Sequence, residues 1–247
     1  MHDTVAIITP VGNEIDSIHN FYNSIMKEIK SNYVWILVFD SYSTDGTYEW
    51  IINHSKEFMY PIHIGKKQGI AKAYLEGYKY ALGLGVTKVI EIDVGHPTEL
   101  LDKFVEALDR KPVAFGTRYK GGKMNQSFYR KIISMGGTVL SKSVLGLPYS
   151  DCTSGFQGIR SDILKKMNLD NFLSKGHFYQ TEFKYYCKNI PFEEIPFSYT
   201  GNNSSIKLKD ILKSLVLLFK MLKREPIIYN IEQDSKIELN IIGGSVP

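Results

Sequence analysis

Acidic side chains follow three apolar runs that are typical of buried strands. The runs and their carboxylates are 4–9 with Glu14, 33–39 with Asp40, and 88–93 with Asp93. Because α/β proteins bind ligands at the carboxyl ends of their parallel strands, we expect these carboxylates to lie close together. Carboxylates bind hard divalent cations and accept hydrogen bonds from ribose and base groups. The pattern therefore predicts a nucleotide site that is held in part through a metal ion.

Plainer roles exist for some of these residues. A capping role explains Asp93 equally well, because a helix-starting Pro-Thr-Glu follows it. Asp45 precedes Gly46, and Asp-Gly pairs commonly make turns. His96 is a candidate second metal ligand beside Asp93, although a histidine before a proline can simply pack.

Two arginines suggest binding of a second anionic group. Arg118 follows the short strand 113–115, and Arg130 starts a predicted helix over 130–145. A guanidinium group binds phosphate through two hydrogen bonds and stays charged. We expect the pair to hold a phosphate-bearing acceptor. An ion pair with a carboxylate at the end of the sheet is the alternative for Arg118, and a solvated helix start is the alternative for Arg130.

Strands and helices alternate over the first 115 residues. Helical spacing predicts helices over 15–30, 48–58, 69–83 and 97–110, between the strands already named and a short strand over 61–65. Such alternation predicts an α/β fold with a mostly parallel sheet. No G-x-G-x-x-G follows the first strand and no P-loop motif occurs, so neither a dinucleotide site nor a P-loop site is indicated.

Eight short motifs then occur in the order found in a known family. They are 9–14 (TPVGNE), 40–47 (DSYSTDGT), 69–74 (GIAKAY) with Gly77, 90–93 (IEID), 116–119 (GTRY) with 121–122, the glycine pair 136–137, 151–156 (DCTSGF) and 179–182 (YQTE). Together they make the chain resemble the family 2 glycosyltransferases of the GT-A fold, within the group of dolichol- and polyprenyl-phosphate mannose synthases. The resemblance covers roughly residues 4 to 207.

The resemblance implies a fold, an activity and a set of site residues. It implies a Rossmann-like, mostly parallel sheet flanked by helices, and transfer of a hexose from GDP or UDP to a polyprenyl or dolichyl phosphate with inversion. The implied nucleotide-sugar contacts are Pro10, Glu14, Asp40, Gly69, Asp93, Gln180 and Glu182. The implied acceptor contacts are Arg118, Arg130, Ser205 and Lys207, and Asp93, Arg118 and Arg130 carry the catalysis.

Two departures from the family pattern concern the metal. Ser41 replaces the second of two aspartates in the second loop, and the Asp-x-Asp metal motif has no second aspartate after Asp93. Asp93, helped by His96, is then the expected ligand of Mg²⁺ or Mn²⁺. These departures also motivate a different hypothesis, a non-catalytic protein that binds nucleotide sugars.

The nature of the acceptor determines whether a base is needed. A phosphate monoester is ionised at neutral pH and can attack the anomeric carbon directly. A glycan hydroxyl, the alternative acceptor in surface polysaccharide synthesis, would need a carboxylate base. Asp151 and Glu182 are the candidates for that base. The arginines favour the phosphate acceptor.

A basic segment is concentrated near the end of the chain. The net charge of +4 consists of +5 over residues 203–224, from six Lys or Arg against one Asp, and −1 over the rest. Over 207–226 the apolar and basic residues fall on opposite faces of a helix. This pattern is typical of a helix at a membrane interface, with packing on the protein core as the alternative. The body of the chain is near neutral, so nucleic acid is not an expected partner.

We therefore expect three parts: a GT-A domain over 1–206, this amphipathic helix over 207–226, and a tail over 227–247 that has no functional interpretation. No apolar run approaches the roughly 20 residues of a membrane span, and the amino terminus does not resemble a leader. Cys152 and Cys187 lack metal-ligand spacing, so we expect free thiols in a reducing compartment. The expected location is the cytoplasmic face of a membrane.

Overall fold

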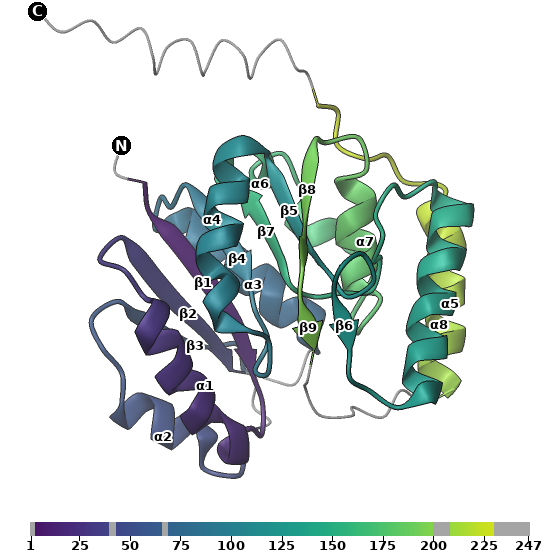
Figure 1. Cartoon of the computed structure of the whole chain (residues 1–247). Helices are drawn as coiled ribbons and strands as arrows, with labels where there is room; N and C mark the ends of the chain where they lie inside the picture. Colours follow the sequence, from purple (N-terminus) through teal and green to yellow (C-terminus); the bar gives the residue numbers. More distant parts are fainter. Residues whose placement is uncertain (1–2, 40–42, 66–68, 200–207, 230–247) are drawn as a thin grey trace, which may run out of the picture.

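The computed structural model describes residues 3–39, 43–65, 69–199 and 208–229. Its centre is a seven-stranded sheet in the order β3-β2-β1-β4-β7-β5-β8 (Figure 1). The strands are β1 (Val5–Val11), β2 (Tyr33–Phe39), β3 (Met59–His63), β4 (Lys88–Glu91), β5 (Val113–Thr117), β7 (Gln157–Arg160) and β8 (Phe192–Pro196). All neighbouring pairs are parallel except those that β7 makes with β4 and β5. The predicted α/β fold with a mostly parallel sheet is confirmed.

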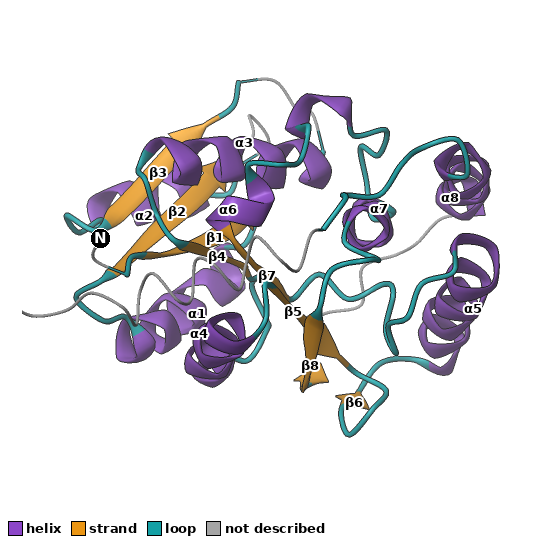
Figure 2. Ribbon diagram, turned by 90° about the horizontal axis from the view of Figure 1, so that it is seen from above, coloured by secondary structure: helices purple, strands orange, loops and turns teal. Residues whose placement is uncertain are grey.

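Helices cover both faces of the sheet (Figure 2). One face carries α1 (Ile15–Glu28), α2 (Thr47–Asn53) and α4 (Leu101–Arg110), the last preceded by a 3-10 turn over Thr98–Leu100. The other face carries α3 (Ile70–Gly83), α6 (Ser161–Leu164) and α7 (Tyr179–Tyr186), with a second 3-10 turn over Leu169–Asn171.

Successive side chains of a strand point to opposite faces of the sheet, so a hydrophobic core forms on each face. In β1, Val5 and Ile7 face the core under α1 and α4, whereas Ala6 and Ile8 face the core under α3. Gly77 of α3 permits this packing, because a Cβ there would lie 2.6 Å from the side chain of Ile8. The continuous apolar runs that predicted these strands therefore arise from burial on both faces.

Two further helices extend the structure beyond β8. Helix α5 (Phe128–Leu145) begins after Ser127, whose side chain accepts the backbone N–H of Arg130, and ends at Gly146 with a φ of 65°. Helix α8 (Leu208–Met221) lies beside α5 in both views (Figures 1 and 2). A small parallel pair, β6 (Lys123–Met124) and β9 (Ser198–Tyr199), lies between this helix pair and the sheet.

Helix α8 packs on the protein along one side only. Leu218 and Met221 are buried against the protein, while Leu212, Val216 and Phe219 are more than half exposed. The predicted boundary between 206 and 207 lies outside the described residues, as does the tail after residue 229. Among the described helices, none is both long and apolar enough to cross a membrane.

Candidate active site

The acidic part of the site forms where β4 ends. Oδ1 of Asp93 accepts a hydrogen bond from the Tyr74 hydroxyl of α3. Desolvation raises the pKa of Asp93 to about 6, the Tyr74 bond opposes this rise, and the charge of Glu14 adds to it. A Cβ placed on Gly155 would lie 3.3 Å from Oδ2 of Asp93 and 3.1 Å from Nε2 of Gln180. The structure therefore brings Asp93 and Gln180, which the sequence predicted to share a site, together beside Gly155.

The loops after β1 and β2 are tied together beside Asp93. Asp45 accepts the backbone N–H groups of Ile15 and Thr47, each at 3.0 Å, and the backbone N–H of Glu14 donates to the Thr47 hydroxyl at 3.0 Å. Desolvation would raise the pKa of Asp45, but the Thr47 hydroxyl and the backbone N–H groups of Ile15 and Thr47 donate to this carboxylate and hold its pKa below the usual value. Asp45 thus has the turn-making role that its sequence suggested.

Glu14 and Pro10 lie at the expected edge of the sheet. Burial raises the pKa of the Glu14 carboxyl, and the nearby charge of Asp45 adds to this rise. Pro10 is the penultimate residue of β1, in register with Val38 of β2. Asp40, Ser205 and Lys207 lie outside the described residues.

His96 lies in an aromatic pocket below Asp93. Its ring contacts those of Phe156, Phe197 and Tyr199 at centroid distances of 5.1–5.5 Å. Nδ1 accepts the backbone N–H of Asp93 at 2.9 Å, which leaves the proton of the neutral ring on Nε2. Burial, aided by the charge of Arg118, lowers the pKa of His96 to about 3. Because its lone pair is occupied, this arrangement gives His96 a packing role and disfavours its predicted role as a metal ligand.

Arg118 is held in a buried ion pair. Its Nε and Nη2 donate to the two oxygens of Asp151 at 2.7 and 2.9 Å, and its side chain is only 9% exposed. Nη2 also donates to the hydroxyls of Ser134 and Thr153. Desolvation would raise the pKa of Asp151, but the bonds to Arg118 outweigh it and lower the pKa. The alternative interpretation of Arg118, an ion pair at the end of the sheet, is therefore present in the structure, and Asp151 stays ionised as its partner.

The basic and acidic parts nevertheless meet at one side chain. Burial raises the pKa of Tyr199, and this phenol also interacts with the charges of Asp93, Arg118, Arg130 and Glu14. Burial lowers the pKa of Arg130, and the charge of Arg118 contributes to the same effect. Tyr199 thus lies within electrostatic range of both arginines and of Asp93, and the two arginines lie within range of each other. Sequence reasoning did not identify Tyr199.

Two predicted sugar contacts have structural roles. Both oxygens of Glu182 accept backbone N–H groups, those of Leu173 and Ser174, each at 2.8 Å. The same loop continues to Lys175, whose carbonyl oxygen would lie 2.2 Å from a Cβ on Gly69. Gly69 also has a φ of 89°, so both the close approach and the backbone angle require glycine there.

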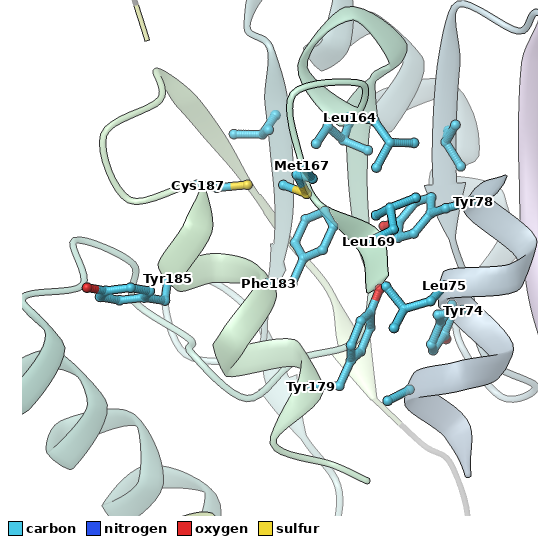
Figure 3. Close-up of a cluster of buried hydrophobic side chains, with 14 of the residues drawn as sticks. Tyr74, Leu75, Tyr78, Leu164, Met167, Leu169, Tyr179, Phe183, Tyr185 and Cys187 are labelled. Carbon is cyan, nitrogen blue, oxygen red and sulfur yellow. The ribbon is translucent and has the colours of Figure 1, made fainter. Parts of the chain in front are cut away.

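A buried polar network that the sequence did not reveal lies beneath the site. Glu91, two residues before Asp93, is fully buried and accepts the Tyr179 hydroxyl at 2.5 Å and Nε2 of Gln157 at 2.9 Å. Desolvation raises the pKa of Glu91 to about 8 despite these bonds. Figure 3 shows Tyr74 of α3 facing Tyr179 of α7, and their rings stack with centroids 5.5 Å apart. The signal for this network in the sequence was the carboxylate of Glu91, which lies inside a run that is otherwise typical of a buried strand.

Metal ligands are sparse among the described residues, which contain no group of three or more His, Cys, Asp or Glu side chains able to hold one ion. Oδ2 of Asp93 receives no hydrogen bond from the described part of the chain.

The chain is similar in sequence to known proteins. The family model described as "Glycosyl transferase family 2" matches residues 6–167. An undecaprenyl-phosphate mannosyltransferase of Micrococcus luteus is 32% identical over 184 residues, which is 72% of this chain and 75% of that protein. A dolichol-phosphate mannosyltransferase of Pyrococcus furiosus is 29% identical over 252 residues, covering 97% of this chain and 68% of that protein.

Solved structures share the fold. The glucosyl-3-phosphoglycerate synthase from Mycobacterium tuberculosis, in complex with Mn²⁺, UDP and phosphoglyceric acid, superposes with a TM-score of 0.64 at 14% identity. The match covers 90% of this chain and 78% of that one. This likeness confirms the GT-A fold, in which related enzymes bind a nucleotide and a divalent metal.

Proposed function

The chain belongs to glycosyl transferase family 2, and on that premise we propose that it transfers a hexose from a nucleoside diphosphate sugar to a polyprenyl or dolichyl phosphate with inversion. The relatives are mannosyltransferases named for undecaprenyl or dolichol phosphate, which supports a lipid phosphate as acceptor and mannose as the sugar. The donor base, guanine or uracil, is left to experiment.

One observation carries this proposal: the two carboxylates considered as general bases are engaged elsewhere, while Arg118 and Arg130 lie within electrostatic range of each other. Asp151 is paired with Arg118, and Glu182 holds two backbone N–H groups. A hydroxyl acceptor would need one of them to remove its proton. A phosphate monoester needs no such step, because it is already an oxyanion at neutral pH.

The proposed reaction is a single displacement. A lipid phosphate oxygen attacks the anomeric carbon as the bond from that carbon to the nucleoside diphosphate breaks. The acceptor phosphate is held by Arg130 and by Nη1 of Arg118, because Nε and Nη2 of Arg118 already donate to Asp151, Ser134 and Thr153. Gln180 and Asp93 line the donor side. The protein contributes alignment and fixed charge rather than a proton transfer.

We include a divalent cation, Mg²⁺ or Mn²⁺, in the proposal. Oδ2 of Asp93 would hold it, and a mostly water and phosphate shell suits Mg²⁺. When bound, the ion would neutralise charge on the departing diphosphate. The raised pKa of Asp93 fits this role, since a carboxylate that is costly to ionise alone is stabilised by a neighbouring cation.

The acceptor also implies a membrane partner, and α5 and α8 offer a surface for it. Exposed apolar residues repeat along both helices: Phe128, Ile132, Met135 and Val139 on α5, and Leu212, Val216, Phe219 and Leu222 on or just after α8. Exposed lysines accompany them at 209, 213, 220 and 223. An apolar strip flanked by positive charge fits the surface of an anionic bilayer. Because α5 also carries Arg130, docking there would bring the lipid phosphate to the site.

Turnover assays test the function. Purified protein would receive GDP- or UDP-hexose, Mg²⁺ or Mn²⁺, and either polyprenyl phosphate or soluble glycans, and release of the nucleoside diphosphate would be followed. We expect turnover only with the lipid. Turnover only with glycans would replace the proposal with a hydroxyl acceptor, and nucleotide binding without turnover would favour a binding protein. Thermal shifts with GDP and UDP identify the base, because a ligand that binds only the folded state stabilises it.

Vesicle co-sedimentation tests the surface. Val139→Glu combined with Val216→Glu should abolish binding to anionic phospholipid vesicles. Ile52→Glu, at an exposed apolar site on α2, should leave binding unchanged. Equal vesicle binding by the wild type, the double variant and Ile52→Glu would reject the proposal that this surface binds the membrane.

A further inference from the structure

A buried lysine lies beneath the site and has no part in the proposed transfer. Lys184 of α7 has an exposed fraction of 0%. Its Nζ donates to the Ser154 carbonyl at 2.6 Å and to Oε1 of Gln157 at 3.3 Å, and lies 5.0 Å from the centre of the Phe115 ring. Burial lowers its pKa to about 8, while the negative charge of Asp151 opposes the shift. A buried ammonium group is costly, so a specific role is expected for it.

One hydrogen bond of Lys184 reaches residues 151–155, a segment that borders both the basic part of the site at Arg118 and the acidic part at Asp93. At one end of residues 151–155, Asp151 holds Arg118 and accepts the Ser154 backbone N–H at 3.1 Å. At the other end, Gly155 packs against Asp93 and Gln180. The arginine and the acidic pocket are therefore joined by five residues, and Lys184 is bonded to this segment one residue before Gly155.

The second bond of Lys184 reaches the strand that carries Asp93. Oε1 of Gln157 accepts the hydrogen bond from Lys184, and Nε2 of Gln157 donates a hydrogen bond to Glu91 of β4. Lys184 also interacts electrostatically with Glu91, Asp151 and Arg118. Its position is thus fixed relative to β4 on one side and to the segment 151–155 on the other.

We propose that Lys184 is a positioning residue that sets the distance between the donor pocket at Asp93 and the acceptor group at Arg118. This inference rests on the proposed function and deepens it. Lys184 touches neither substrate, but its two hydrogen bonds fix the segment between them. Displacement depends steeply on the separation of the reacting atoms, and a misplacement of about 1 Å can cost about 100-fold in rate.

Lys184→Met tests the inference, because methionine has a similar length and no charge. We expect kcat for transfer to polyprenyl phosphate, counted per nucleotide-binding site, to fall at least about tenfold. The donor Kd and the acceptor KM should change by less than about threefold, since each half stays intact while their spacing relaxes. Lys188→Met is the matched control: Lys188 follows the same helix and donates to a carbonyl, that of Leu145, away from the site. It should retain the wild-type kcat.

Several outcomes would overturn the inference. Lys184→Met with a wild-type kcat per binding site rejects it, as does a loss explained entirely by fewer folded molecules. A rise in donor Kd or acceptor KM that matches the fall in kcat would indicate damage to one half rather than to the spacing. If Lys184→Met does not fold, Lys184→Gln, which retains an N–H donor, is tested by the same measurements. Absence of lipid transfer by the wild type would instead reject the proposed function, and the inference with it.

Discussion

Replacing Asp151 with asparagine should destabilise the protein strongly, because it leaves a buried cation without its partner. The Asp151 side chain is 0% exposed and that of Arg118 is 9% exposed, so solvent screens the pair weakly. Removing one member of a buried pair costs about 3–5 kcal/mol. Asparagine retains the shape and one oxygen acceptor, which places the expected loss near the lower limit, about 3 kcal/mol. This is a large part of the roughly 5–15 kcal/mol that stabilises a typical protein.

Urea unfolding at pH 7 measures this loss, and the double variant Asp151→Asn with Arg118→Met provides the control. Removing both charges should restore much of the stability, because the cost comes from the isolated cation. A loss below about 1 kcal/mol for Asp151→Asn would refute the reasoning, since that is the value for a solvent-exposed pair.

The same pair should contribute to acid denaturation. The pKa of Asp151 is lower in the folded protein than in the unfolded chain, so the folded state favours the ionised form. Its stabilisation is therefore complete above the unfolded pKa of about 3.9 and disappears as the pH falls through the folded pKa. Asp151→Asn should flatten the stability profile below about pH 4, and an unchanged acid profile would contradict this assignment.

Three further variants test other parts of the site. Arg130→Ala should raise the KM for the lipid phosphate about tenfold or more by removing a charge-assisted hydrogen bond, with the donor KM unchanged; an equal rise in both would contradict its role. Tyr74→Phe removes a bond that favours ionised Asp93, so the acid limb of the pH–rate profile should move upward by roughly one unit, and an unmoved limb would reject that bond. Gly69→Ala should lower the free energy of unfolding by about 2 kcal/mol or more, whereas Gly83→Ala, with open space around its Cβ, should not; thermal melts compare the two.

Local pattern was sufficient to predict the framework. The apolar runs of β1 and β2 are continuous because both faces of these strands are buried, and that signal is present in the sequence itself. The positions of Glu14 and Asp93 followed from a general rule, that parallel strands end at one edge of the sheet. The antiparallel strand β7 was not predictable, because its direction depends on the connection through α5 rather than on its own residues.

The sequence by itself determined which charged residues reach the edge of the sheet, whereas the tertiary structure decided what each one does there. Arg118 and Asp151 are 33 residues apart, and Lys184 is 30 residues from the carbonyl that it binds. The role of a buried charge depends on the partner that folding brings within about 3 Å, and a local pattern contains no information about that partner. For this reason Asp151 and Glu182, which the sequence suggested as candidate bases, have structural roles instead. The places of Lys184 and Tyr199 in the site could be identified only from the tertiary structure, which brings distant segments together.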